Sequence, residues 1–169
     1  GGIDLDASAN TMTINVTSVN DAPAGTNNTV TTNEDTAYVF SVADFGLTDV
    51  SDSPANALAF VKITTLPAAG TLTLGAGASA PGAVAAGQFV SAADIAFLTF
   101  TPAANANGAG YAGFTFQVQD NGGTANGGVD FDMSSNTITI DVAAVDDAPV
   151  LNTNLGTTVI EGAAVGITT

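Results

Sequence analysis

Residues 127–149 have the sequence GGVDFDMSSNTITIDVAAVDDAP. In its middle part polar and apolar side chains alternate, and the apolar set is Ile138, Ile140 and Val142. A period of two with β-branched residues is typical of a strand that has one face in a core and the other in solvent. We therefore predict a half-buried β-strand in this stretch.

A second copy of the stretch stands at the beginning of the chain as GGIDLDASANTMTINVTSVNDAP, residues 1–23. The two copies align without a gap at an offset of 149 − 23 = 126 residues, and 14 of the 23 positions are identical. Residues 11–17 alternate in the same way, with Met12, Ile14 and Val16 as the apolar set. Such agreement indicates a tandem array whose repeat is about one domain long.

The repeat length predicts the domain organisation. One complete repeat is expected over residues 21–146, with 1–20 holding the last strand of the preceding repeat and 147–169 the first strand of the following one. The segment NEDTAYVFS also resembles IEGAAVGIT near the end of the chain, which aligns Glu34 with Glu161. We expect both ends to be cut edges of a longer protein.

Composition excludes several classes of function. The chain has 16 acidic residues, one basic residue and a formal net charge of −15. Binding to phosphate needs a Lys/Arg footprint, so we expect neither nucleic acid as a partner nor direct contact with a membrane, and dissolved cations are favoured. The absence of Cys and His removes disulfides, thiolate metal sites and the commonest general base. No apolar run is long enough to span a bilayer.

Short alternating runs separated by Gly, Pro, Asn and Asp clusters predict the remaining strands. These runs cover residues 29–32, 37–42, 57–64, 71–74, 97–101 and 111–119. The segments SVADFGL and SAADIAF are at most single helical turns. The predicted fold class is all-β, an antiparallel Greek-key β-sandwich.

Four segments carry a resemblance to a known family: EDTAYVFSVADFGLTD, LPAAGTLTL, VSAADIAFLTFTPAANANGAGYAGFTFQVQDNGG and NTITIDVAAVDDAP. Together they resemble the cadherin-like tandem repeats of large bacterial surface proteins and adhesins, over the entire chain. The resemblance implies an extracellular location on the bacterial surface, repeats joined end to end, and calcium at the joints. The implied partners are neighbouring repeats of the same protein, and lateral association of chains is left open.

The resemblance also implies which residues hold calcium. The linker motif D-x-N-D-N-x-P is similar to VNDAP and VDDAP, the first-strand glutamate to NEDT, the D-x-D motif to TDVSD, and the A-x-D motif to QVQD. Carried over, these motifs give Asn20, Asp21, Glu34, Asp49, Asp52, Asp120, Asp146 and Asp147. The family topology implies that Asp49, Asp52 and Asp120 lie beside Asn20 and Asp21 at one end, with the other ligands at the opposite end. The L-D-R-E motif of animal cadherins is missing, so we expect fewer and weaker ions at each joint.

Other conspicuous residues favour ordinary structural roles. Asp4, Asp6, Asp130 and Asp132 could hold a second ion, but a solvated loop before the last strand is favoured. Asp44 is expected to cap backbone amides, and Lys62 to be a surface charge at a strand edge. Strand-borne phenylalanines are expected in the core, namely Phe60, Phe97, Phe100, Phe114 and Phe116.

Two functions remain open, and an enzyme is not expected, because no nucleophile–base pair accompanies the acids. The favoured function is a structural spacer repeat of an extracellular stalk, adhesin or filament, stiffened by calcium. The alternative is a module that binds a glycan or protein through its long loops, 75–87 and 105–113. Those loops carry Ala and Gly where binding surfaces usually carry aromatic or Arg anchors, which favours the spacer.

Overall fold

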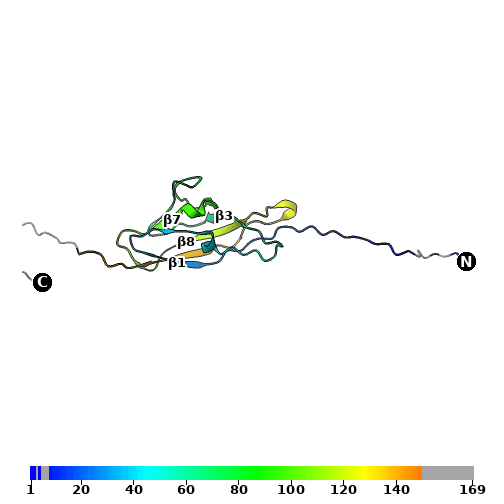
Figure 1. Cartoon of the computed structure of the whole chain (residues 1–169), viewed down its shortest axis with the longest axis horizontal. Helices are drawn as coiled ribbons and strands as arrows, with labels where there is room; N and C mark the ends of the chain where they lie inside the picture. Colours follow the sequence, from blue (N-terminus) through cyan, green and yellow to red (C-terminus); the bar gives the residue numbers. More distant parts are fainter. Residues whose placement is uncertain (3, 5–7, 150–169) are drawn as a thin grey trace, which may run out of the picture.

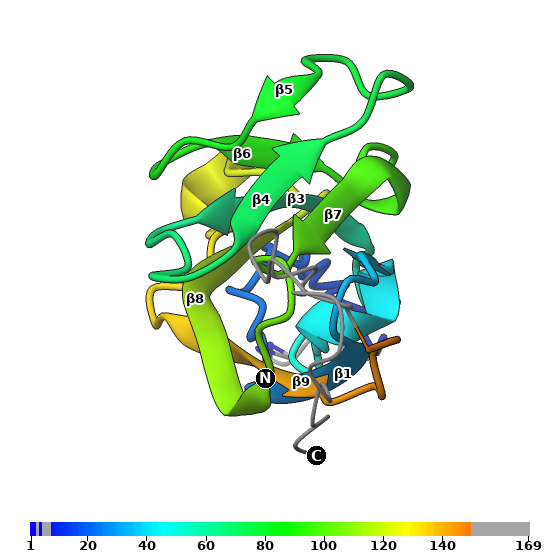
Figure 2. The same ribbon diagram turned by 90° about the vertical axis from the view of Figure 1, so that its left-hand side faces the viewer.

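Two β-sheets face each other in the structure, a computed structural model that describes residues 1–2, 4 and 8–149 (Figures 1 and 2). The first sheet has the order β1-β9-β8-β3-β6, and the second has the order β2-β7-β4-β5. The first contains β1 (Asn28–Asn33), β3 (Leu58–Ile63), β6 (Phe89–Ser91), β8 (Gly108–Asp120) and β9 (Asn136–Ala143). The second contains β2 (Tyr38–Val39), β4 (Thr71–Leu74), β5 (Gly82–Ala83) and β7 (Leu98–Thr101). The predicted all-β sandwich is confirmed.

Three short 3₁₀ helices, η1 (Val42–Phe45), η2 (Ile95–Phe97) and η3 (Ala125–Gly127), join the strands. The first two lie in the segments predicted as single helical turns. In η1 the Asp44 carboxylate accepts a hydrogen bond of 2.7 Å from the Ser41 backbone N–H, so the expected capping role of Asp44 is confirmed. No helix among the described residues is long and apolar enough to cross a membrane.

The strands differ from the prediction in three respects. All strand neighbours are antiparallel except β1 and β9, which run parallel from Asn28↔Ile138 to Asn33↔Ala143. The strand predicted over 37–42 is only the two-residue β2, because the capped turn of η1 follows it. The short strands β5 and β6 were not predicted, since they offer too few residues for a period to be recognised.

Phenylalanine rings fill the core between the sheets. Phe114 packs edge-on against Phe40 with 5.5 Å between ring centroids, and Phe116 against Phe45 with 5.0 Å. Phe100 is also fully buried, so the core prediction is confirmed for the residues on β7 and β8.

The core prediction was wrong for Phe60 and Phe97, which are 40% and 39% exposed. On β3 the inward positions belong to Val61 and Ile63, which are fully buried. Because side chains alternate along a strand, Phe60 faces outward together with Lys62. Phe97 lies in η2, before β7 begins.

The two copies of the repeated stretch have different structures. In the second copy, Ile138, Ile140 and Val142 point from β9 into the core. In the first copy, the strand predicted over 11–17 is not formed, and the chain runs away from the sandwich (Figure 1). No described strand pairs with it, and a strand requires such a neighbour. The end of the predicted following repeat, 150–169 with Glu161, lies outside the described residues.

Candidate metal centre

Predicted ligands from three separate segments meet at the end of the sandwich where the N-terminal segment enters. The Asn20 side-chain amide donates to Asp120 Oδ1 over 3.1 Å and to the Val129 carbonyl over 2.8 Å. The Asp21 backbone N–H donates to Asp52 Oδ2 over 2.9 Å. The structure therefore brings the segment at Asn20 and Asp21 onto the end of β8 and the loop that carries Asp52.

Asn56 links the remaining predicted ligand, Asp49, to this cluster. Its backbone N–H donates to Asp49 Oδ2 over 2.6 Å, and its side-chain amide donates to Asn20 Oδ1. Hydrogen bonds thus run from Asp49 through Asn56 and Asn20 to Asp120. Sequence reasoning missed Asn56, because its contacts depend on the path of a loop and no motif marks it.

Two carboxylates of the cluster are buried. Asp49 is 6% exposed and Asp120 is 2% exposed. Burial raises the pKa of Asp120, the negative charges of Asp49 and Asp130 raise it further, and hydrogen bonds from Gly122 and Asn20 oppose the shift. Asp49 Oδ1 has no hydrogen-bond partner, and it is the one buried side-chain polar atom of this kind among the described residues. An unpaired buried carboxylate oxygen is costly unless a cation or another donor satisfies it.

A polar hollow of about 210 Å³ opens beside the cluster. It is lined by Ser18, Asn20, Asp52, Ser53, Pro54, Asn56 and Gly122. Within the part of the chain that the structure describes, no three acidic side chains converge on one point. An ion here would therefore need amide, backbone or water oxygens in addition to carboxylates, as calcium commonly uses.

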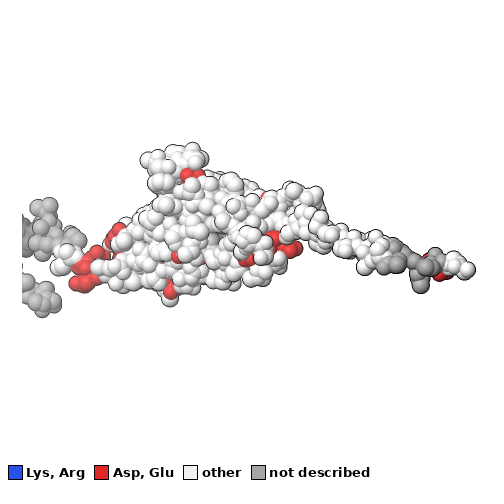
Figure 3. All heavy atoms as spheres, turned by 45° about the vertical axis from the view of Figure 1, so that its right-hand side comes forward, with Lys and Arg blue, Asp and Glu red and all other residues white. Residues whose placement is uncertain are grey.

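Glu34 lies at the opposite end and is 6% exposed. Its carboxylate accepts hydrogen bonds from the Val145 backbone N–H over 2.5 Å and from the Asn107 side-chain amide over 2.8 Å. These bonds lower the pKa of Glu34. Asp146 and Asp147 follow directly and are exposed. The predicted ligands thus divide between the two ends, and Figure 3 shows acidic atoms gathered where the chain enters and leaves the sandwich.

The prediction that Asp132 lies in a solvated loop was wrong, because Asp132 is 4% exposed. Its carboxylate accepts hydrogen bonds from the backbone N–H groups of Gly25 and Ser134, each over 2.8 Å, and from the Asn136 amide over 3.0 Å. These donors satisfy the carboxylate and fix the start of β9, so Asp132 has a structural role. Its copy Asp6 lies outside the described residues.

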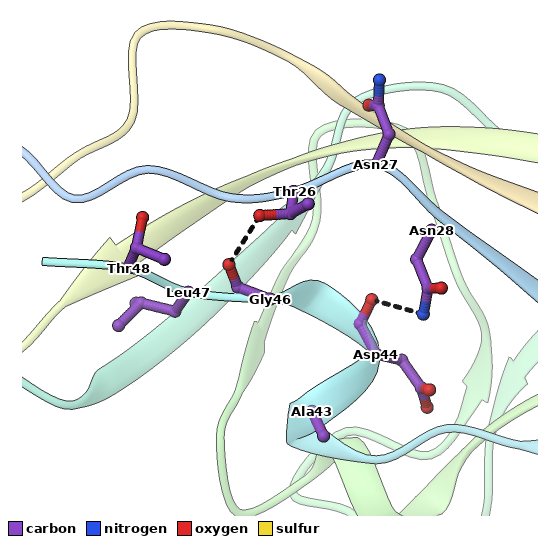
Figure 4. A pocket seen from close by; sticks show the side chains of 8 residues that line it. All are labelled: Thr26, Asn27, Asn28, Ala43, Asp44, Gly46, Leu47 and Thr48. Carbon is purple, nitrogen blue, oxygen red and sulfur yellow. Dashed lines mark hydrogen bonds between the residues drawn. The ribbon is translucent and has the colours of Figure 1, made fainter.

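The hollow in Figure 4, of about 410 Å³, lies between the segment before β1 and the turn around η1. The Thr26 hydroxyl donates to the Gly46 carbonyl over 3.0 Å, and the Asn28 amide to the Asp44 carbonyl over 3.1 Å. The Asn27 side chain points away from both contacts and accepts a hydrogen bond from the Thr137 N–H. Polar groups here fasten one segment to another, and no aromatic ring lines the hollow.

Comparison with known proteins gives one match. A search of curated proteins found no similar protein, and a search of solved structures found no match. The family model described as the bacterial Ig domain matches residues 20–132, from the Asn20 contact to the Asp132 anchor. With most of its length matched and its strands in two facing sheets, the chain belongs to the bacterial Ig domain family.

Proposed function

We propose that the chain is a spacer repeat of an extracellular bacterial stalk, adhesin or filament, and that calcium stiffens the joints between neighbouring repeats. Membership of the bacterial Ig domain family supports a surface-protein module from a non-catalytic family. The cadherin-like resemblance and the duplicated stretch at an offset of 126 residues support the finer assignment. Neighbouring repeats of the same protein are the proposed partners.

The observation that carries the calcium proposal is the unpaired Asp49 Oδ1, buried near a second buried carboxylate, Asp120. A cation would satisfy this oxygen and offset the repulsion between the two negative charges. The available donors are carboxylate, amide and backbone oxygens, with neither His nor Cys in the chain. Such hard oxygen donors suit Ca²⁺ and disfavour zinc.

The repeated pentapeptide supports the joint model. At VDDAP the Val145 N–H is held by Glu34, and at VNDAP the Asn20 amide is held by Asp120. Since Val19 is equivalent to Val145 and Asn20 to Asp146, a linker between two repeats would make both contacts at once. In the VDDAP linker, Asp146 stands at the position that Asn20 has in VNDAP. Its carboxylate would then face the aspartate of the following repeat that is equivalent to Asp120. A cation between two facing carboxylates would offset their mutual repulsion.

Calcium titration of the chain tests the site directly. We expect binding in the weak extracellular class, with a Kd of about 10⁻⁴ to 10⁻³ M, and loss of binding in Asp49→Asn. Asp44→Asn is the matched control, because Asp44 caps η1 and is no part of the cluster. Equal calcium binding by both variants would contradict the assignment of the site.

Small-angle scattering of two or three consecutive repeats tests the spacer function. In millimolar calcium the particle should be extended, and a chelator should shorten it while the β-sheet circular dichroism stays the same. Asp147→Ala should behave in calcium as the parent does in chelator. If the dimensions do not change on chelation, the joints are held by packing alone.

The alternative, a ligand-binding module, is favoured by one observation on the outer face of β3 and β6. Phe60 and Phe89 are 40% and 48% exposed there, with ring centroids 6.3 Å apart. Lys62 Nζ lies 5.6 Å from the Phe89 centroid and 5.5 Å from the Phe131 centroid. Binding on a glycan array that Phe89→Ala abolishes would favour this function over the spacer.

A further inference from the structure

The chain contains the dipeptide Asn–Gly at Asn107–Gly108, Asn121–Gly122 and Asn126–Gly127. In such a pair the glycine backbone nitrogen can attack the asparagine side-chain carbon Cγ. The new N–Cγ bond closes a succinimide ring, and the side-chain nitrogen leaves as ammonia with the glycine N–H proton. Water then opens the ring to aspartate or isoaspartate. Glycine favours the attack because it has no Cβ to obstruct the approach.

The first pair is held against this reaction. The Asn107 side-chain amide donates to Glu34 Oε2 over 2.8 Å. Gly108 begins β8 and pairs with Val142 of β9, so the attacking nitrogen belongs to a strand. Ring closure requires the side chain to leave Glu34 and the start of the strand to open.

The second pair is held at both reacting groups. Asn121 Oδ1 accepts a hydrogen bond of 2.9 Å from the Ala57 N–H. The Gly122 N–H donates to Asp120 Oδ1 over 2.8 Å. The side-chain carbonyl and the attacking nitrogen are therefore engaged with different partners.

The third pair has no such restraint on its side chain. Asn126 is exposed, and its side chain makes no hydrogen bond to any residue that the structure describes. It lies in η3, with φ of 57° at Asn126 and 87° at Gly127. We propose that Asn126 is a spontaneous modification site, converted to aspartate or isoaspartate by the Gly127 nitrogen, and that Asn107 and Asn121 are protected by the fold.

The position of the loop gives the modification a consequence. Just after Asn126, the Val129 N–H donates to the Asn20 carbonyl over 2.9 Å, and a Cβ on Gly128 would lie 3.1 Å from the Asn20 Cβ. The product adds one carboxylate to the loop that holds Asn20, and isoaspartate also lengthens the loop backbone. An effect on calcium at the joint rests on the proposed function, whereas the modification does not.

The test is to incubate the folded full chain in mildly alkaline buffer and to locate the replacement of NH₂ by OH through peptide mass mapping. In the folded chain Asn126 should be lost at least about tenfold faster than Asn107 or Asn121, since local opening must precede reaction at those sites. In denaturant the three rates should converge. Equal rates in the folded chain, or an unchanged order in denaturant, would overturn the proposal.

Two variants sharpen the test. Asn126→Gln should abolish the early product, because the corresponding ring is larger and closes slowly. Glu34→Ala removes the carboxylate that holds Asn107, so modification at Asn107 should accelerate while that at Asn126 stays the same. Acceleration at both sites, with the circular dichroism of a folded chain, would show that general loosening sets the rates and would contradict site-specific protection.

Discussion

Residues 10–17 and 136–143 have nearly the same sequence, NTMTINVT and NTITIDVA, and different structures. In β9, Ile138 and Ile140 are fully buried, whereas their counterparts Met12 and Ile14 are 85% and 78% exposed. The alternating pattern is therefore not sufficient to form this strand. A neighbouring strand to pair with is also required, and β9 has β1 on one side and β8 on the other.

The largest expected effect is the difference in stability between two single variants, Ile140→Ala and Ile14→Ala, at equivalent positions of the two copies. Ile140→Ala should lower the free energy of unfolding by about 2–5 kcal/mol, because it leaves a cavity between two packed sheets. Ile14→Ala should change it by less than about 0.5 kcal/mol, as expected of an exposed side chain. Urea unfolding of both variants measures the difference. A comparable loss in Ile14→Ala would show that the first copy is packed after all.

The next effect concerns how β9 begins. Asp132→Ala removes the buried acceptor for the N–H groups of Gly25 and Ser134, and we expect a loss of about 2–3 kcal/mol because hydrogen bonds to a charged group are lost. Asp130→Ala is the matched control, since among the described residues its carboxylate accepts a hydrogen bond from the Gln119 side chain alone. The control should lose less than about 1 kcal/mol. Equal losses would mean that Asp132 does not anchor the strand.

These contrasts show how much the sequence could predict. The period of two identified β3, β4, β7 and β9 and the central parts of β1 and β8, because burial of one face follows from alternation. In residues 11–17 the same period is present without a strand in this structure, because pattern alone does not say whether a partner strand is present. The core prediction failed for Phe60, because Val61 and Ile63 take the inward positions of β3 and size alone does not decide which face of a strand is buried.

For the candidate site, the resemblance to cadherin-like repeats implied which acids lie at which end. Asn20, Asp21, Asp49, Asp52 and Asp120 do lie together, apart from Glu34. The connecting groups Asn56, Asn107 and the Val129 carbonyl were not predictable, because loop paths and backbone groups bring them into contact. The buried state of Asp132 was missed for the same reason, since backbone N–H groups are its main partners.

A smaller effect is expected where β8 approaches β9 closely at Gly113. A Cβ on Gly113 would lie 2.9 Å from the Ile138 carbonyl oxygen, so Gly113→Ala should push β8 from β9 and cost about 1–3 kcal/mol. At Gly75 the nearest atom to a new Cβ is 3.6 Å away. Gly75→Ala should therefore be within about 0.5 kcal/mol of the parent. Equal changes in the thermal unfolding of the two variants would show that a methyl group at Gly113 does not separate β8 from β9.

The smallest expected effect is a difference between the two ends of the sandwich in their response to pH. At one end the Asn20 side chain donates a hydrogen bond to Asp120, and at the other the Val145 backbone N–H donates to Glu34. Burial, with the charges of Asp49 and Asp130, raises the pKa of Asp120. Its folded state holds the proton more tightly than its unfolded state, so lowering the pH from above the raised pKa towards the ordinary aspartate value adds stability. Hydrogen bonds lower the pKa of Glu34. Its contribution is present above the ordinary glutamate value and is lost as the pH falls through the lowered pKa.

The two ends should therefore respond to acid with opposite signs in calcium-free buffer. Asp120→Asn should abolish the gain, so the stability of the parent relative to this variant should rise as the pH falls. Glu34→Gln should abolish the loss, so the free energy of unfolding of the parent should decrease relative to that variant as the pH falls. Urea unfolding from neutral pH down through the carboxyl range measures both trends. If the parent gained on both variants in acid, the lowered pKa at Glu34 would be contradicted, and the contact at Val145 would not depend on the charge of that carboxylate.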